Sequence, residues 1–111
     1  MNDCLFCQII AGALPSERVY EDDRVVVIKD RFPKAPVHLL LMPRTHIESL
    51  EDLGGLDDAE IAHLMRLLAG IAHKQGLGQG FRTIINTGAG GGQEIFHLHI
   101  HLLGGGRLPG F

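Results

Sequence analysis

The sequence of 111 residues lacks the features of a membrane-spanning, secreted or nucleic-acid-binding protein. Its longest strictly apolar runs are a few residues long, such as Val25 to Ile28, whereas a membrane span needs about 18 or more. The 10 Lys and Arg against 13 Asp and Glu give a net charge of −3, and no run of basic residues offers a broad surface for nucleic acid. The first residues lack the basic region and the long apolar stretch of a secretory signal. We therefore expect a soluble, cytoplasmic protein that binds neither nucleic acid nor a membrane.

The chain is also short for more than one domain, because domains usually have about 100–150 residues. Its hydrophobic content of 45% is enough for one core, and a chain of this size buries roughly 60–70% of its unfolded surface when it folds. We predict a single domain that spans residues 1–111.

Cysteine is scarce. Cys4 and Cys7 are the two cysteines of the sequence, and two thiols cannot make the disulfide framework of a small secreted domain. Their C-x-x-C spacing can place two thiolates on one metal ion, which would be half of a zinc site. A thioredoxin-type redox role would need a strand and a helix around the pair, and this pair stands at the start of the sequence. Two small buried side chains without a metal are the other interpretation.

The spacing of apolar residues predicts the secondary structure. Residues 4–13 have the pattern of a short helix, and residues 61–72 have that of a long helix, which begins at Asp57 or Asp58 and stops at Gly76. Mostly consecutive strands with two helices predict an α+β fold, with an antiparallel sheet of about five strands. The expected strands are residues 18–20, 24–29, 38–42, 81–86 and 96–103.

The most unusual feature is the segment from His97 to Leu103, in which histidine alternates with aliphatic residues. In a strand, its three histidines share one face, and its aliphatic side chains enter the core from the other. Imidazole titrates near neutral pH, so this face favours chemistry over a merely solvated surface. Two interpretations compete. Either the histidines hold a catalytic zinc with an open position for water, or one of them is a nucleophile that the others orient.

The glycine-rich segment from Gly88 to Gly92 directly precedes the histidines and helps to choose between these interpretations. Its backbone N–H groups can form an anion-binding nest for phosphate. It is not a Walker loop, because no Lys-Ser or Lys-Thr follows, and it is not a dinucleotide fingerprint, because Gln93 occupies the position of the last glycine. A phosphate-binding loop beside the histidines favours the interpretation in which one histidine is a nucleophile.

These residues resemble the histidine triad (HIT) family. The segment from His97 to Leu103 matches the family signature, in which three histidines alternate with apolar residues. The chain is most similar to the nucleotide-binding (Hint-like) branch, whose short chains act as homodimers on nucleoside phosphoramidates. Further matching motifs follow in the family's order along nearly the whole chain, namely Asp30, Pro36-Val37-His38, Pro43-Arg44-Thr45-His46, Asn86-Thr87-Gly88, Gly92-Gln93 and Leu103-Gly104-Gly105.

The resemblance implies a HIT-like fold and a hydrolase that cleaves purine nucleoside phosphoramidates, or related 5′-nucleotide conjugates, at the α-phosphorus. His99 matches the family's nucleophile, which forms a covalent nucleotidyl-histidine that water then hydrolyses. His101 matches a residue that positions the phosphate or relays protons, and His38 matches one that supports the triad. The chemistry itself then needs no cofactor.

The resemblance also implies a set of nucleotide contacts. Asp30 matches the carboxylate that accepts the ribose hydroxyls, and Asn86 with nearby N–H groups would hold the phosphate oxygens. Two positions depart from the family: Glu94 replaces a serine that assists the leaving amine, and Arg31 replaces an apolar residue after the ribose aspartate. The expected contacts are Phe6, Ile9 and Ile28 around the base, with Asp30, Arg31, Asn86, Gly92, Gln93, Glu94, Ile95, His99 and His101.

Some bacterial-type members of the family complete a C-x-x-C pair with two histidines, which match His46 and His97. His97 is then unavailable for proton transfer. The remaining histidines, His63 and His73, fall in the long helix, and we expect both on its solvated face. One structural zinc per chain is therefore expected, held by Cys4, Cys7, His46 and His97.

Two other functions fit the same scaffold. The first is hydrolysis of dinucleoside polyphosphates. The second is a noncatalytic nucleotide sensor, which the glutamate at position 94 suggests. The expected homodimer rests on the resemblance alone.

Overall fold

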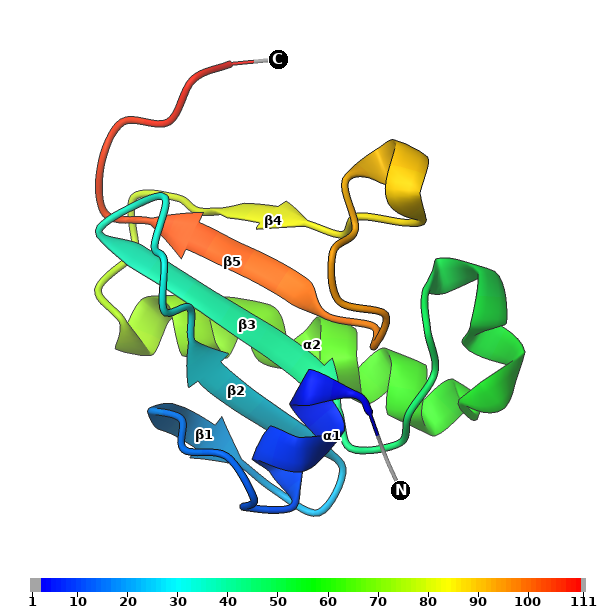
Figure 1. Ribbon diagram of the computed structural model, residues 1–111. Helices are drawn as coiled ribbons and strands as arrows, with labels where there is room; N and C mark the ends of the chain where they lie inside the picture. The colour runs from blue at the N-terminus through cyan, green and yellow to red at the C-terminus, as the bar shows by residue number, and fades with distance from the viewer. Residues whose placement is uncertain (1–2, 111) are drawn as a thin grey trace.

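The computed structural model describes residues 3–110, which form a five-stranded antiparallel sheet with a helix on each face (Figure 1). The strand order is β1-β2-β3-β5-β4, so β2, β3 and β5 lie inside the sheet and β1 and β4 form its edges. The predicted α+β fold with five antiparallel strands is confirmed. The elements are α1 Leu5–Ile10, β1 Arg18–Glu21, β2 Val25–Lys29, β3 Val37–Pro43, α2 Asp58–Lys74, β4 Arg82–Ile84 and β5 Ile100–Gly104, with 3-10 helices at Leu50–Gly55 and Ala89–Gly91.

The predicted single domain of residues 1–111 includes Met1, Asn2 and Phe111, which lie outside the described residues, so its ends stay a prediction. Within residues 3–110, no helix combines the length and the apolar character that crossing a membrane would require.

The sheet separates two apolar clusters because its central strands are buried on both faces. Val25 and Val27 of β2 point to the α2 face, where they join a cluster with Leu64 and Leu68 of α2. The alternate residues of β2 and β3, Val26, Ile28, Leu40 and Met42, point to the other face and pack against Phe6 and Ile9 of α1. A strand buried on both faces reads as continuous hydrophobic sequence, as Val25–Ile28 does. The small cluster on the α1 face lies beside the histidines, because Phe6 in that cluster contacts the rings of His97 and His99.

The long helix α2 begins where its capping residues predict. The Asp57 side chain accepts a hydrogen bond from the Glu60 N–H, and the Glu60 side chain accepts one from the Asp57 N–H. This reciprocal pair satisfies two N–H groups at the start of the helix. His73 and Lys74 lie in the last turn, where positive charge is favourable.

The histidine segment enters the sheet later than its alternation predicts. β5 begins at Ile100, so residues 96–99 lie outside the sheet, and β4 is shorter than the predicted strand 81–86. The backbone groups of this segment are bonded elsewhere: the Leu98 N–H donates to the Ile47 carbonyl at 2.8 Å, and the His97 carbonyl accepts from the His99 ring rather than from a neighbouring strand. Leu98 and Ile100 nevertheless enter the core as expected.

His63 is not simply a solvated residue of the long helix, as predicted. Its Nε2 lies 2.7 Å from Oδ2 of Asp22 in the β1–β2 turn, and the Tyr20 hydroxyl donates to the same oxygen at 2.7 Å. Oδ1 of Asp22 accepts the N–H groups of Arg24 and Val25, each at 2.8 Å. Asp22 thus joins the first hairpin to α2, whereas His73 is exposed as expected.

The pKa of Asp22 lies well below its ordinary value. Burial raises it, but the hydrogen bonds from Tyr20, His63 and the backbone outweigh that effect. A carboxylate whose pKa is lowered by folding stabilises the folded state above its ordinary pKa, and that stabilisation is lost as the pH falls.

Asp22→Asn should therefore lower the free energy of unfolding by about 2 kcal/mol at pH 7, since hydrogen bonds to charged groups are worth roughly 1.5–3 kcal/mol. The difference should shrink below about pH 4, where the unfolded chain also binds the proton. Urea unfolding at both pH values measures it, with Asp23→Asn as a matched control at the adjacent exposed carboxylate. If Asp22→Asn lowers the free energy of unfolding by the same amount at both pH values, the charge of Asp22 is not what stabilises the fold.

Candidate active site and metal centre

Five of the seven histidines gather on the α1 face of the sheet. They come from three segments: β3 and the loop after it, the irregular segment before β5, and β5 itself. His97 is fully buried, and His99 has 8% of its surface exposed. The five residues are His38, His46, His97, His99 and His101.

Backbone carbonyls determine which nitrogen carries the proton in two of these rings. Nε2–H of His97 donates to the Pro43 carbonyl at 2.8 Å, and Nδ1–H of His99 donates to the His97 carbonyl at 2.7 Å. A carbonyl can only accept, so the proton lies on the nitrogen that faces it. Neutral His97 therefore presents the lone pair of Nδ1, and neutral His99 presents that of Nε2.

A third backbone group orders the pair formed by His38 and His101. The Lys34 N–H donates to Nδ1 of His38 at 3.0 Å, so the proton of neutral His38 lies on Nε2. That nitrogen lies 2.9 Å from Nδ1 of His101 and donates to it, which leaves the His101 proton on its own Nε2. Oδ2 of Asp30 lies 3.4 Å from Nε2 of His38. The result is a directed chain of hydrogen bonds from the backbone to His101.

Burial keeps these imidazoles neutral at neutral pH. It is the largest cause that lowers the pKa of His38, His97 and His99, because the charged form loses its hydration. For His101, burial and then the neighbouring His99 and His38 lower the pKa to about 4. The tautomers described above are therefore those of the protein at physiological pH.

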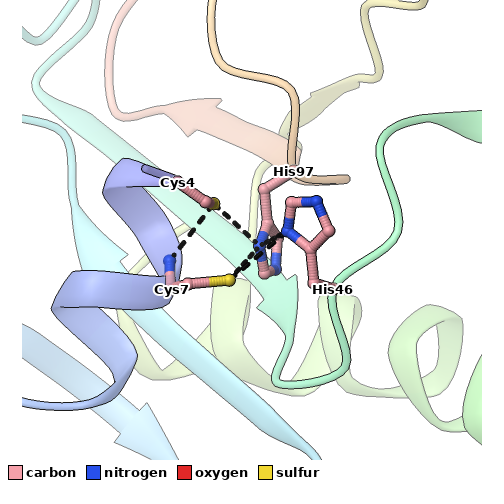
Figure 2. A group of neighbouring side chains, drawn as sticks. All are labelled: Cys4, Cys7, His46 and His97. Atoms are coloured by element: carbon pink, nitrogen blue, oxygen red, sulfur yellow. Dashed lines mark hydrogen bonds between the residues drawn. The ribbon is translucent and has the colours of Figure 1, made fainter. Parts of the chain in front are cut away.

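A second cluster brings Cys4 and Cys7 together with His46 and His97, as Figure 2 shows. Nδ1 of His97 lies 3.4 Å from the Cys4 sulfur, Nδ1 of His46 lies 3.3 Å from the Cys7 sulfur, and the two nitrogens are 3.1 Å apart. Metal–ligand bonds of about 2.0–2.3 Å give a tetrahedron with edges of about 3.3–3.8 Å. The four predicted ligands therefore fit one metal ion, with the lone pair of His97 already directed to it by the Pro43 carbonyl.

The group of Asp30, His38 and His101 also brings three potential ligand atoms within 4.8 Å of one another, yet it suits a metal poorly. A metal on Nε2 of His38 would move the His38 proton to Nδ1, where it would face the Lys34 N–H. Two donors cannot share a hydrogen bond. This group is a proton-ordered chain rather than a metal site.

The glycine-rich loop is held from inside by two amide side chains. Nε2 of buried Gln93 donates to the carbonyls of Glu48 and Ile95 at 2.7 and 3.0 Å, and its Oε1 accepts the Gly88 N–H at 2.9 Å. Nδ2 of Asn86 donates to the Gly91 carbonyl at 2.8 Å. The Gln93 side chain therefore shapes the loop, and sequence reasoning did not foresee this role.

The N–H groups of this loop differ in their availability. The Gly92 N–H donates to the Ala89 carbonyl at 3.0 Å, and its φ of +84° suits glycine. Among residues 3–110, no protein group accepts a hydrogen bond from the N–H of Glu94 or Ile95. These two N–H groups, rather than that of Gly92, are free to face an anion.

The residues expected around a nucleotide differ in their exposure. Oδ1 of Asp30 accepts the Phe32 N–H at 2.8 Å, and Arg31 and Glu94 are exposed. Phe6, Ile9 and Ile28 are buried together, and Phe6 has only 2% of its surface exposed. The Phe6 ring lies edge-on to the ring of His99, with 5.0 Å between centroids. No sequence pattern predicted this contact.

The comparisons with known proteins agree with this geometry. The family model of the HIT domain matches residues 11–108. A histidine triad protein from Clostridium difficile is 44% identical, with a TM-score of 0.90 over 100% of this chain and 97% of the other. A HIT family hydrolase from Legionella pneumophila is 37% identical, with a TM-score of 0.88 over 96% of both chains.

Two curated relatives extend the comparison. Protein HitA of Neisseria gonorrhoeae is 47% identical over 94% of this chain and 97% of its own. The purine nucleoside phosphoramidase of Escherichia coli K12 is 38% identical over 96% of this chain and 91% of its own. The chain therefore belongs to the histidine triad family, and it is similar to hydrolases of that family.

Proposed function

We propose that this protein is a nucleotide-binding hydrolase that cleaves purine nucleoside phosphoramidates, or related 5′-nucleotide conjugates, through a nucleotidyl intermediate on His99. The observation that carries the proposal is the hydrogen bond from Nδ1–H of His99 to the His97 carbonyl. It leaves the lone pair of Nε2 on a buried, neutral imidazole, which is the form a nucleophile needs. The similarity to the Escherichia coli phosphoramidase supports the choice of substrate.

In the first step, Nε2 of His99 forms a bond to the α-phosphorus while the bond from phosphorus to the leaving nitrogen breaks. The His97 carbonyl stabilises the positive charge that develops on the His99 ring, because Nδ1–H already donates to it. The electron pair leaves with the amine, which takes a proton from Nε2 of His101; His101 carries a proton on both nitrogens while the phosphate is bound, and Nε2–H of His38 then donates to Oδ2 of Asp30, 3.4 Å away, instead of to His101. In the second step, water attacks phosphorus, the bond to His99 breaks, and the proton of the water returns to His101.

His101 is suited to this exchange because a bound phosphate changes its protonation. Its pKa of about 4 in the free protein is lowered by burial and by neighbouring imidazoles, and an adjacent phosphate raises it again. His38 holds Nδ1 of His101 at 2.9 Å, which directs Nε2 of His101 toward the substrate in this proposal. Glu94 is exposed and is not needed as the proton donor.

We assign the remaining contacts as the family resemblance implies. Asp30 accepts the ribose hydroxyls, and Asn86 with the N–H groups of Glu94 and Ile95 faces the phosphate. The base lies over the edges of Phe6, Ile9 and Ile28, with Arg31 at its border. A cytoplasmic homodimer is part of the same proposal.

We also propose that the bound metal is one structural zinc per chain. The support is the donor set of two thiols and two imidazoles, all within 4.8 Å of one another. Four protein ligands leave no open position for water, so zinc here would supply rigidity and no chemistry.

Incubation with adenosine 5′-phosphoramidate should release AMP, and His99→Ala should reduce the rate on the order of 10⁴-fold or more, since the nucleophile is lost. His73→Ala is the matched control, because His73 is exposed on α2. Undiminished turnover by His99→Ala would reject the mechanism. Parallel rates on a dinucleoside polyphosphate show which leaving group is preferred.

Elemental analysis should find one zinc per chain in the purified protein, and Cys4→Ser or His46→Ala should lose most of it, because a tetrahedral site with three ligands binds far more weakly. His99→Ala should retain the zinc. Loss of zinc from the His99 variant with retention in the Cys4 variant would place the metal at the triad and contradict the proposed ligands.

A further inference from the structure

Helix α1 connects the two sites. It spans six residues, too few for a helix that is stable on its own. Its C-terminal end is held by Arg18, whose Nη2 donates to the carbonyls of Ile9 and Ile10 at 2.8 and 3.1 Å. Cys4 is the N-cap residue at its N-terminal end and Cys7 lies within the helix, and both side chains face the two histidines of the metal centre (Figure 2). The orientation of this helix therefore depends on the attachment of its two ends as well as on the packing of Phe6 and Ile9 against the sheet.

Phe6 lies between the two cysteines and touches both functional sites. Its ring meets the His97 ring with 6.0 Å between centroids and an interplanar angle of 80°. It meets the His99 ring at 5.0 Å and 82°. Edge-to-face pairs of this kind are specific in geometry. One buried phenyl ring thus contacts a metal-ligand residue and the proposed nucleophile.

We propose that Phe6 is a positioning residue for His99, and that the metal centre orients the nucleophile through it. This inference rests on the proposed function of His99. The hydrogen bond to the His97 carbonyl fixes the position of Nδ1 of His99. The tilt of the His99 ring must then be limited by the side chains packed against it. Phe6 lies against one part of the ring, and His101 contacts it with 5.1 Å between centroids. Phe6 therefore holds the direction of Nε2.

The metal ligands surround this contact in the sequence. Cys4 and Cys7 bracket Phe6, and His97 precedes His99 by two residues. When these ligands share one ion, the backbone beside Phe6 and the backbone beside His99 are fixed relative to each other. The sulfur-to-nitrogen contacts are weak hydrogen bonds without the ion, since thiols are poor donors. The position of the Phe6 ring against His99 is then less restrained.

The test is a cycle of two changes, removal of zinc and Phe6→Leu, which keeps an apolar side chain and removes the ring. Each form is examined by imidazole ¹⁵N NMR at one neutral pH and by the maximal rate at which saturating adenosine 5′-phosphoramidate labels the enzyme, because Phe6 is also assigned to the base and weaker binding alone would leave that maximal rate unchanged. In the zinc-loaded protein, Phe6→Leu should retain the metal, shift the His99 nitrogen signals and slow labelling by about fivefold to tenfold, the worth of one edge-to-face pair. Phe81→Leu, at a half-exposed ring outside both sites, is the matched control.

Removal of zinc from the natural protein should cause the same shift and the same loss of rate. Removal of zinc from Phe6→Leu should cause little further shift of the His99 signals and little further loss of labelling rate, because both changes break the same connection from the metal centre through Phe6 to His99. Two outcomes would overturn the inference. One is a doubly changed protein whose loss of labelling rate equals the product of the two single losses, and the other is a set of His99 signals that stays unchanged when zinc is removed. If the circular dichroism of the zinc-free protein shows that it has unfolded, the test rests on the zinc-loaded Phe6→Leu protein alone, whose His99 signals and labelling rate must both change. A natural protein that labels at no measurable rate would reject the proposed function, while the NMR cycle, which needs no substrate, would still test Phe6.

Discussion

The site depends on one constraint: a neutral imidazole has a single N–H proton, and the backbone group beside the ring determines which of the two nitrogens carries it. The Pro43 carbonyl directs a lone pair of His97 to the cysteines, and the His97 carbonyl directs a lone pair of His99 away from the backbone. The Lys34 N–H reverses this order in His38, which becomes a donor to His101. Three backbone groups thus give chemically identical side chains the different protonation patterns that the proposed metal binding, nucleophilic attack and proton transfer require.

This division requires the rings to stay neutral, and burial provides that condition. The sheet contributes a dry floor of alternate side chains from β2 and β3, and α1 covers it. Desolvation lowers the pKa of each triad histidine, so the lone pairs remain available at neutral pH. Cys7 lies in α1 and Cys4 is its N-cap residue, so the helix that covers this face of the sheet also contributes two residues of the cysteine-histidine cluster.

The sequence predicted what depends on side-chain pattern. The two-faced burial of residues 25–28, the cap of α2 at Asp57 and the cluster of Cys4, Cys7, His46 and His97 follow from periodicity, capping chemistry and family resemblance. What depends on hydrogen bonds that form only once the chain has folded was not predictable. The alternation of residues 97–103 indicated a strand throughout, yet the His97 carbonyl turns to the His99 ring and delays the strand to Ile100. The buried position of Gln93 and the pairing of His63 with Asp22 have the same origin.

In the proposed mechanism the nucleotidyl group is transferred twice, first to His99 and then to water. Each in-line displacement inverts the configuration at phosphorus, so two displacements restore it. A nucleoside phosphoramidate made chiral at the α-phosphorus with sulfur, hydrolysed in water labelled with heavy oxygen, reports the outcome directly. The two-step mechanism should give a product of retained configuration, whereas an inverted product would show that water attacks the substrate in one step and that His99 is not the nucleophile.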